Sequence, residues 1–297
     1  MKKTIVLKFE PPCHLPKKRK AMKTLTRFYL WTALAVGVAF SAINAVGQQS
    51  PTGLGQPALA NKVFGHQVMS SDGQKVGNLN NLVIDLESGR ILYGVIGTGS
   101  ERVGVAPQIF TQTLPSGNEL RVNVAKQKID GAPKFGPFDK TEQLGQASYV
   151  DQVYSYFGQT PWWQGNTAAN VGSFHNVHKA SQLTGMEVQN VNNAKIGKIE
   201  GLAVDLPSGR VVYVILAPDS SLNLAQNRYL LPPQAVTLSP DHNHLVTGIS
   251  NDQLTNAPHF TQNSPPNLSD MTLASQIYQY YGKQLWFNTA GTQPTGR

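Results

Sequence analysis

The chain has 297 residues, a length that suggests about two domains, and its 40% apolar residues suffice for packed cores. The net charge of +8 is typical of nucleic-acid-binding proteins, but the first 50 residues hold nine Lys or Arg and one Glu, which is the whole excess. The remainder holds 16 basic and 16 acidic residues. A neutral body has no long-range attraction for phosphate backbones, so we expect no nucleic-acid partner.

Residues 1–47 have the order of an export signal. Lys23 and Arg27 precede an uncharged apolar run, and Ala45-Val46-Gly47 then offers a small-x-small cleavage site. These features predict a leader over 1–47 that is removed on export. The mature chain would begin near Gln48 and be periplasmic or extracellular.

Two features of the leader stay open. Counted from Met1 the leader has 47 residues, whereas counted from Met22 it has 26, which lies within the usual range and makes Met22 a second candidate for the start. The apolar run also approaches the length that spans a bilayer, so an anchor over 28–46 in the inner membrane is the alternative to cleavage. Polar residues within the run favour cleavage. The leader, if it is uncleaved, is the one membrane contact that we expect.

The single cysteine of the sequence, Cys13, lies within the leader. It neither follows an apolar run nor precedes small residues, so it does not match a lipid-attachment site. A mature chain without cysteine cannot contain a disulfide, a thiol nucleophile or a thiolate metal site. Its stability must therefore come from core packing.

The rest of the chain contains one unit twice. Residues 63–100 align with residues 183–220 without a gap, and 12 of the 38 positions are identical. Similarity continues downstream with small changes of register, as between Arg102–Thr111 and Arg228–Thr237. A period of about 120 residues has the size of a domain and exceeds that of solenoid repeats or propeller blades. We interpret the pattern as a tandem duplication of one complete domain.

Each copy has the pattern of a series of short strands. In the first copy, apolar alternation and the turn dipeptides Asp72-Gly73 and Ser116-Gly117 predict strands over 63–69, 75–79, 82–86, 91–96, 102–106 and 119–124. Short strands at this density predict a small closed barrel, which leaves no sheet edge exposed.

The best preserved segment of the repeat is a hairpin turn, Asp-Leu-x-Ser-Gly-Arg. Gly supplies the left-handed conformation that closes a short loop, Asp can accept backbone N–H groups, and Arg leaves the turn beside the Asp, where the two could pair. A ligand-binding Asp–Arg pair is the alternative to this structural interpretation, which we favour. The motif residues are Asp85, Ser88, Gly89, Arg90, Asp205, Ser208, Gly209 and Arg210.

Each copy ends in a predicted amphipathic helix. Val150, Val153, Tyr154 and Phe157 follow helical spacing, and Gly158 is a suitable C-cap. Aromatic residues are concentrated here, in two segments that we call the aromatic tails: Tyr154–Trp163 and Tyr278–Phe287. The four tail residues that we name as a candidate interaction surface are Tyr156, Trp162, Tyr280 and Trp286. The alternative, which stays open, is that the helix face packs on its own barrel and that Tyr156 and Trp162 close this packing.

These motifs together resemble the PRC-barrel family. The resemblance rests on Gly-x-x-Val, Lys-x-Gly-x-x-x-x-Leu, Asp-Leu-x-Ser-Gly-Arg and Pro-Gln, in that order and twice, and it covers about 61–125 and 181–250. It implies a mainly β protein with two small PRC-type β-barrels in tandem, each followed by a short helix. The boundaries that we predict are 61–165 for the first domain, 166–178 for a linker and 179–288 for the second domain. We expect the two domains to fold separately.

Residues that could carry chemistry are few. His242, His244 and Asp241 form a weak candidate metal site, and His175-x-x-His178 has a spacing that metals can use, but neither has a counterpart in the other copy. We find no constellation for acid–base or nucleophilic catalysis, and we predict neither an enzyme nor a bound cofactor.

The family resemblance implies a contact domain, because PRC-barrels include the extramembrane barrel of the photosynthetic reaction centre H subunit. We therefore predict a non-catalytic protein-interaction module of the cell envelope with a protein partner that the sequence does not identify. One alternative is a metal- or small-ligand-binding protein or enzyme that uses the His242 loop. Another is a scaffold in a membrane complex, by analogy with the H subunit.

Overall fold

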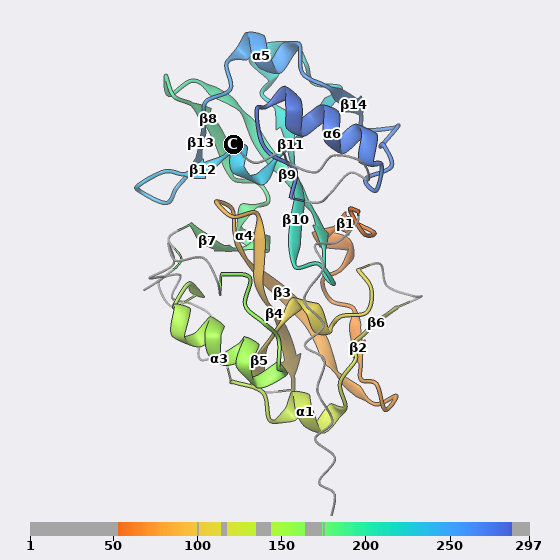
Figure 1. The fold of residues 1–297 in the computed structure, drawn as a ribbon. Coiled ribbons are helices and arrows are strands. Elements are labelled where there is room, and N and C mark those ends of the chain that lie inside the picture. Colours follow the sequence, from red (N-terminus) through yellow and green to blue (C-terminus); the bar gives the residue numbers. More distant parts are fainter. Residues whose placement is uncertain are drawn as a thin grey trace, which may run out of the picture. The chain divides into compact units, whose positions relative to one another are not determined.

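Two long β-hairpins, one in each copy of the repeat, form the framework of the computed structural model (Figure 1). The structure describes residues 53–99, 101–113, 118–134, 144–163, 174 and 176–286. The predicted leader, Ser116-Gly117, His175 and Phe287 lie outside these residues. Both copies belong to one compact unit, residues 48–297.

The first copy contains a series of short strands and ends in a helix, as the sequence predicts. Its elements are β1 (Ala58–Leu59), η1 (Ala60–Lys62), β2 (Gln67–Met69), β3 (Lys75–Asp85), β4 (Arg90–Thr98), β5 (Glu101–Val105), η2 (Pro107–Ile109), β6 (Glu119–Arg121), α1 (Lys126–Asp130) and α3 (Ala147–Phe157). The two strands predicted over 75–79 and 82–86 are one strand, β3, because a bulge between Leu79 and Asn81 absorbs the break in alternation.

The second copy repeats this order. Its elements are β7 (Val177–Lys179), α4 (Ala180–Leu183), β8 (Glu187–Asn190), β9 (Lys195–Asp205), β10 (Arg210–Pro218), η3 (Ser220–Leu222), β11 (Asn227–Leu231), η4 (Pro233–Ala235), β12 (Thr237–Leu238), β13 (Leu245–Thr247), α5 (Asn251–Thr255), β14 (His259–Thr261) and α6 (Met271–Tyr280). Strand β7 begins inside the segment 166–178 that the sequence suggests is a linker.

The mainly β class is confirmed, but the sheet does not close around each copy. Among the described residues the hydrogen-bonded order is β12-β13-β8-β9-β10-β4-β3-β2-β6, which continues from one copy into the other. In both copies the first strand after η1 or α4 pairs in parallel with a later strand, β2 with β6 and β8 with β13. We expected a closed barrel in each copy. The hydrogen-bonded strands instead form one open sheet that runs through both copies, because β4 pairs with β10.

The first strand of each copy pairs with the other copy. Strand β1 adds to β9, with Ala58 opposite Val204, and β7 adds to β3, with His178 opposite Ile84. Positions 58 and 178 are related by the 120-residue repeat, as are 84 and 204, so the exchange is reciprocal. In Figure 1 the orange segment with β1 accordingly lies beside the blue-green strands of the second copy.

The two hairpin turns meet each other. Ile91 N donates to Gly209 O at 2.9 Å, and Val211 N donates to Gly89 O at 3.0 Å. Arg90 is thereby placed opposite Arg210 between β4 and β10. We call these two turns, with the strand ends that they join, the junction.

The predicted helices are present and bury the predicted face. In α3 the residues Val150, Val153, Tyr154 and Phe157 are buried, and Gly158 at φ 65° ends the helix in the left-handed conformation. Helix α6 repeats this with Ala274, Ile277 and Tyr278. The short helices α1 and α5 were not predicted, because five residues give no periodic signal.

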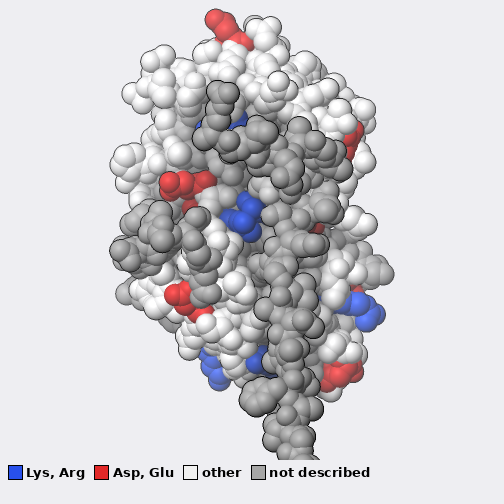
Figure 2. Space-filling model, in the orientation of Figure 1, with Lys and Arg blue, Asp and Glu red and all other residues white. Residues whose placement is uncertain are grey.

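The surface carries few charges, and they are mixed in sign. In the view of Figure 2 the described surface is mostly uncharged, with acidic and basic residues interspersed. This agrees with the equal numbers of acidic and basic residues after the leader. Within the described residues, no helix combines the length and apolar character that crossing a membrane requires.

Separate folding of the two halves stays a prediction. The exchange of first strands adds an expectation about the oligomeric state of each half. A chain of residues 53–163 or 174–286 has an edge on its long hairpin that the other copy's first strand normally covers. We expect either half, expressed alone, to fold as a homodimer, because a second copy can supply the missing strand and turn. Light scattering coupled to size-exclusion chromatography measures this. A half that unfolds cooperatively as a monomer at micromolar concentration would contradict the homodimer, although it would confirm separate folding. A half that does not fold, alone or as a dimer, would contradict separate folding.

Candidate functional site

The junction is the best candidate for a functional site, because it gathers the preserved motif of both copies at one place. In the first copy the turn is closed by Asp85, which is only 5% exposed. Its carboxylate accepts from Glu87 N at 3.3 Å, from Ser88 N at 3.2 Å and from the Ser88 hydroxyl. Burial raises the pKa of Asp85, and the Ser88 hydrogen bonds oppose that rise. The predicted capping role of the Asp is therefore present.

The equivalent Asp205 has partners from the other copy. Its carboxylate accepts from Thr113 Oγ1 at 2.9 Å and from Gln56 N at 3.3 Å, besides its own turn amide at Ser208. Thr113 Oγ1 in turn accepts from Leu206 N at 2.9 Å. The repeat places Ser239 where Thr113 stands, but the Ser239 hydroxyl donates to Asp241 instead. The two turns thus share a sequence but differ in what holds them.

Both turn glycines adopt the predicted positive φ, 64° at Gly89 and 63° at Gly209. Each turn also rests on the Pro-Gln segment of the other copy. A Cβ atom at Gly89 would lie 2.8 Å from Pro233 Cγ and 2.8 Å from Gln234 Nε2, and at Gly209 it would lie 3.5 Å from Pro107 Cβ. The glycines therefore serve the contact between the copies as well as the turn.

The arginines of the motif do not pair with the aspartates. Although Asp85 is the cross-strand neighbour of Arg90, and Asp205 that of Arg210, no ion pair joins them among the described residues. Instead the Arg90 guanidinium lies 5.1 Å from the centroid of the Trp162 ring, and that of Arg210 lies 4.4 Å from that of Trp286. The expected local pair is not formed because both carboxylates are taken by turn amides and hydroxyls.

Burial shifts the pKa of both arginines. It lowers the pKa of Arg90 to about 10 and that of Arg210 to about 9, and in Arg210 the charge of Arg90 adds to the shift. Each guanidinium is partly screened from water by the aromatic tail of its own copy. Cation–π contact with a Trp ring offsets part of the cost of this burial.

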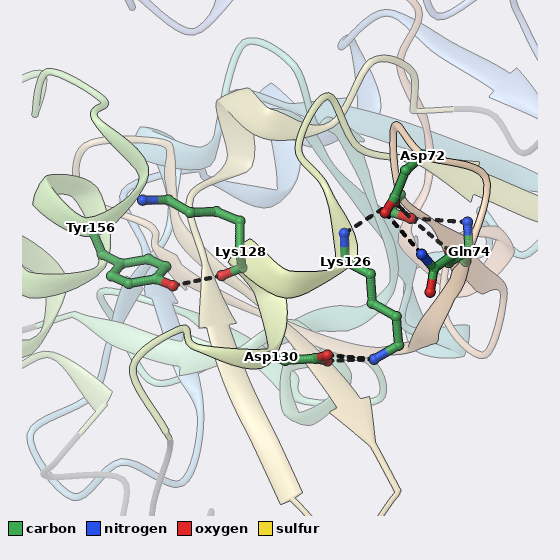
Figure 3. Close-up of polar contacts among 7 residues, drawn as sticks. Asp72, Gln74, Lys126, Lys128, Asp130 and Tyr156 are labelled. Atoms are coloured by element: carbon green, nitrogen blue, oxygen red, sulfur yellow. Dashed lines mark hydrogen bonds and ion pairs between the residues drawn. The ribbon is translucent and has the colours of Figure 1, made fainter.

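The aromatic tails make mainly internal contacts. Tyr156 on α3 donates to Lys128 O at 2.8 Å, and the Lys128 ammonium lies 4.1 Å from the centre of its ring (Figure 3). Tyr280 on α6 donates to Gln253 O at 2.6 Å. Each tyrosine thus joins the last helix of its copy to the preceding short helix. The four candidate surface residues are half-buried, and their role in binding a partner stays a prediction.

The candidate metal residues do not converge. Asp241 accepts from Ser239 and Asn243, and His244 Nδ1 lies 3.6 Å from its carboxylate, but the His242 ring instead lies 6.4 Å from that of His178. Across the described ranges, no group of three or more His, Cys, Asp or Glu is arranged to hold a metal ion.

His178 is the second residue of the His-x-x-His spacing, but its position in the structure points to a role in packing. It lies in the exchanged strand β7, is 4% exposed, and its Nε2 is buried without a partner among the described residues. Burial, helped by the nearby His242, lowers the pKa of His178 to about 4. Sequence reasoning also missed Gln56 and Thr113. Gln56 contacts Asp205 through its backbone N–H, so its residue type carries no signal. The signal for Thr113 would have been Ser239, the hydroxyl residue at the equivalent position of the second copy.

Two domain-sized copies of one mainly β unit, joined through their turns and first strands, define a tandem β-domain protein. The family comparison gives this class its name: the PRC-barrel domain matches residues 58–129 and again residues 175–247. The chain therefore contains two PRC-barrel domains in tandem, as the sequence motifs indicate. PRC-barrel domains are generally non-catalytic. A comparison with curated proteins found no match for the chain.

Replacing the turn glycine should destabilise the protein more than replacing the turn serine. Gly89→Val forces a branched residue to φ 64° and drives its Cβ into Pro233, and we expect a loss of about 2–4 kcal/mol in the free energy of unfolding. Ser88→Ala removes one hydroxyl hydrogen bond and should cost about 1 kcal/mol. Urea denaturation measures both variants. Equal losses would show that neither the positive φ nor the contact with Pro233 matters.

The stability of the protein should fall as the pH drops from about 6.5 toward 4. The pKa of His178 is lowered from 6.5 to about 4, so the folded state resists protonation that the unfolded state accepts. The contribution is full above pH 6.5, and the loss by pH 4 is at most about 3 kcal/mol.

Thermal melting of the wild type and of His178→Ala at pH 7 and pH 5 tests this. The substitution installs the residue found at the equivalent position, Ala58, and should shrink the difference between the two pH values. His259→Ala, at an exposed histidine, is the matched control and should leave that difference unchanged. An unaltered pH response in His178→Ala would contradict the prediction.

Proposed function

We propose that the protein is an exported, non-catalytic interaction module of the cell envelope, built from its two PRC-barrel domains. The observation that carries the proposal is the junction. It fuses two similar domains into one unit, and the reciprocal strand exchange gives each domain the same relation to the other. Such a unit presents two related faces at a fixed spacing. The leader composition supports export, and the domain family supports a contact role.

A pair of linked domains suits a partner that is itself repeated or symmetric. When one face has bound, the second is held near its own site, and the effective concentration strengthens binding without any new contact. Rigid fusion through the junction reduces the entropy that a flexible linker would lose on binding. The half-exposed aromatic side chains Tyr156 and Tyr280 lie at equivalent positions of the two domains and are the contacts we propose.

The other two functions are supported less well. A metal- or ligand-binding role for His242, His244 and Asp241 would require these side chains to move together, since Asp241 is engaged with Ser239 and Asn243. A scaffold role in a membrane complex is supported only by the analogy with the barrel of the reaction-centre H subunit. Under that role residues 28–46 would remain as an anchor in the inner membrane.

Crosslinking in the native envelope, followed by mass spectrometry, tests the proposal. We expect a defined protein partner that crosslinks to the wild type and is lost when Tyr156 and Tyr280 are both changed to Ala. Tyr156→Phe with Tyr280→Phe keeps both rings, removes only the hydrogen bonds to Lys128 O and Gln253 O, and is the matched control that should retain the partner. The same spectra should show a mature terminus at Gln48.

Three results would count against parts of this proposal. Recovery of peptides from residues 28–40 on the protein would favour the anchored form over the exported one. A stoichiometric metal that is lost in His244→Ala, with no crosslinked partner, would favour the ligand-binding alternative. Loss of the partner in the Phe variant as well as in the Ala variant would assign the effect to folding of the tails, which circular dichroism of both variants checks.

A further inference from the structure

We propose that Arg90 and Arg210 together form a binding site for a doubly charged oxyanion of the phosphate class. The two residues lie opposite each other where β4 meets β10, at the centre of the junction. The flanking hydrogen bonds run from Ile91 N to Gly209 O and from Val211 N to Gly89 O, which makes Arg90 and Arg210 a non-hydrogen-bonded pair. In such a pair the two side chains leave the same face of the sheet at the closer of the two cross-strand spacings.

Two like charges at this spacing destabilise a sheet unless something compensates them. Asp85 lies opposite Arg90 and Asp205 lies opposite Arg210 on the paired strands. Both carboxylates, however, already accept hydrogen bonds, Asp85 from its own turn and Asp205 from its turn and from Thr113. Within the described part of the chain, neither guanidinium donates a hydrogen bond or forms an ion pair. By contrast Lys126, Lys134 and Lys195 each have a carboxylate partner.

The surroundings suit an anion rather than a third side chain. Each guanidinium lies over a Trp ring, Trp162 for Arg90 and Trp286 for Arg210. A guanidinium that stacks on an aromatic face can still donate hydrogen bonds from its edge. Both arginines are half-buried but keep some contact with solvent. Partial burial strengthens a charge-assisted hydrogen bond, and the guanidinium forks match the oxygen spacing of phosphate.

The charge and symmetry of the pair select the ligand class. The two arginines are cross-strand neighbours, and the charge of Arg90 acts on Arg210. A single dianion would neutralise both charges, whereas a carboxylate would neutralise one. Burial is the main cause of the lowered pKa of Arg210, and anion binding would relieve the second cause, repulsion by Arg90. The site is independent of the partner surface on the tyrosines, so its failure would leave the proposed interaction role untouched.

Isothermal titration with sodium phosphate at pH 8, against sodium chloride at the same ionic strength, tests the site. We expect one phosphate per chain, and we expect Arg90→Gln and Arg210→Gln each to weaken binding at least about tenfold. Arg121→Gln, at an exposed arginine, removes the same charge elsewhere and should bind as the wild type. Titration with acetate at equal ionic strength should give binding that is about tenfold weaker or absent.

A second measurement keeps the test valid if a variant folds poorly. In chloride alone, each Gln variant should stay folded, because removal of a like-charge contact offsets the loss of its contact with Trp162 or Trp286. Phosphate should raise the melting temperature of the wild type more than that of either variant. Co-sedimentation with phosphatidylglycerol vesicles that inorganic phosphate displaces would assign the same chemistry to a lipid headgroup. Binding equal in the wild type and both Gln variants, acetate as effective as phosphate, or no binding in either assay would overturn the site.

Discussion

The fold depends on two main-chain hydrogen bonds, which join the two Ser-Gly-Arg turns at the junction. They continue the ladder of β4 onto β10 and so make the hairpins of both copies one surface. The first strands then extend this surface reciprocally, β1 onto β9 and β7 onto β3. Without the turn-to-turn bonds, the long hairpins would each expose an unpaired end next to buried apolar residues, an arrangement that favours aggregation.

The junction explains why the turn motif is the best preserved part of the repeat. A hairpin turn alone needs a glycine and a capping aspartate, and many sequences supply them. Here each glycine must also admit the Pro-Gln segment of the other copy, because a Cβ at Gly89 would meet Pro233 and Gln234. Each arginine must reach the tryptophan of its own tail. The motif therefore satisfies three demands at once, which few substitutions can meet.

Much of the fold could be predicted from the sequence, because the evidence for it is local. Alternation predicts the strands, helical spacing predicts α3 and α6, and the doubled motif predicts two copies of one domain. The exchange could not be predicted, since β1 is two residues long and no local pattern says which strand it joins. The pairing of Arg90 with Trp162 is equally hidden: the sequence places Asp85 nearer, and only the turn geometry shows that this carboxylate is already engaged.

The two domains are related by the repeat but are not equivalent in chemistry. Asp205 is held by Thr113 and Gln56 of the first domain, whereas Asp85 is held by its own turn. At the exchanged strands, the second domain buries His178 where the first has Ala58. The buried carboxylate that is held by the other copy and the acid-sensitive histidine therefore both belong to the second domain. Acid would therefore loosen β7 from β3 before β1 from β9, so that the two faces of the unit respond differently to the same change of pH.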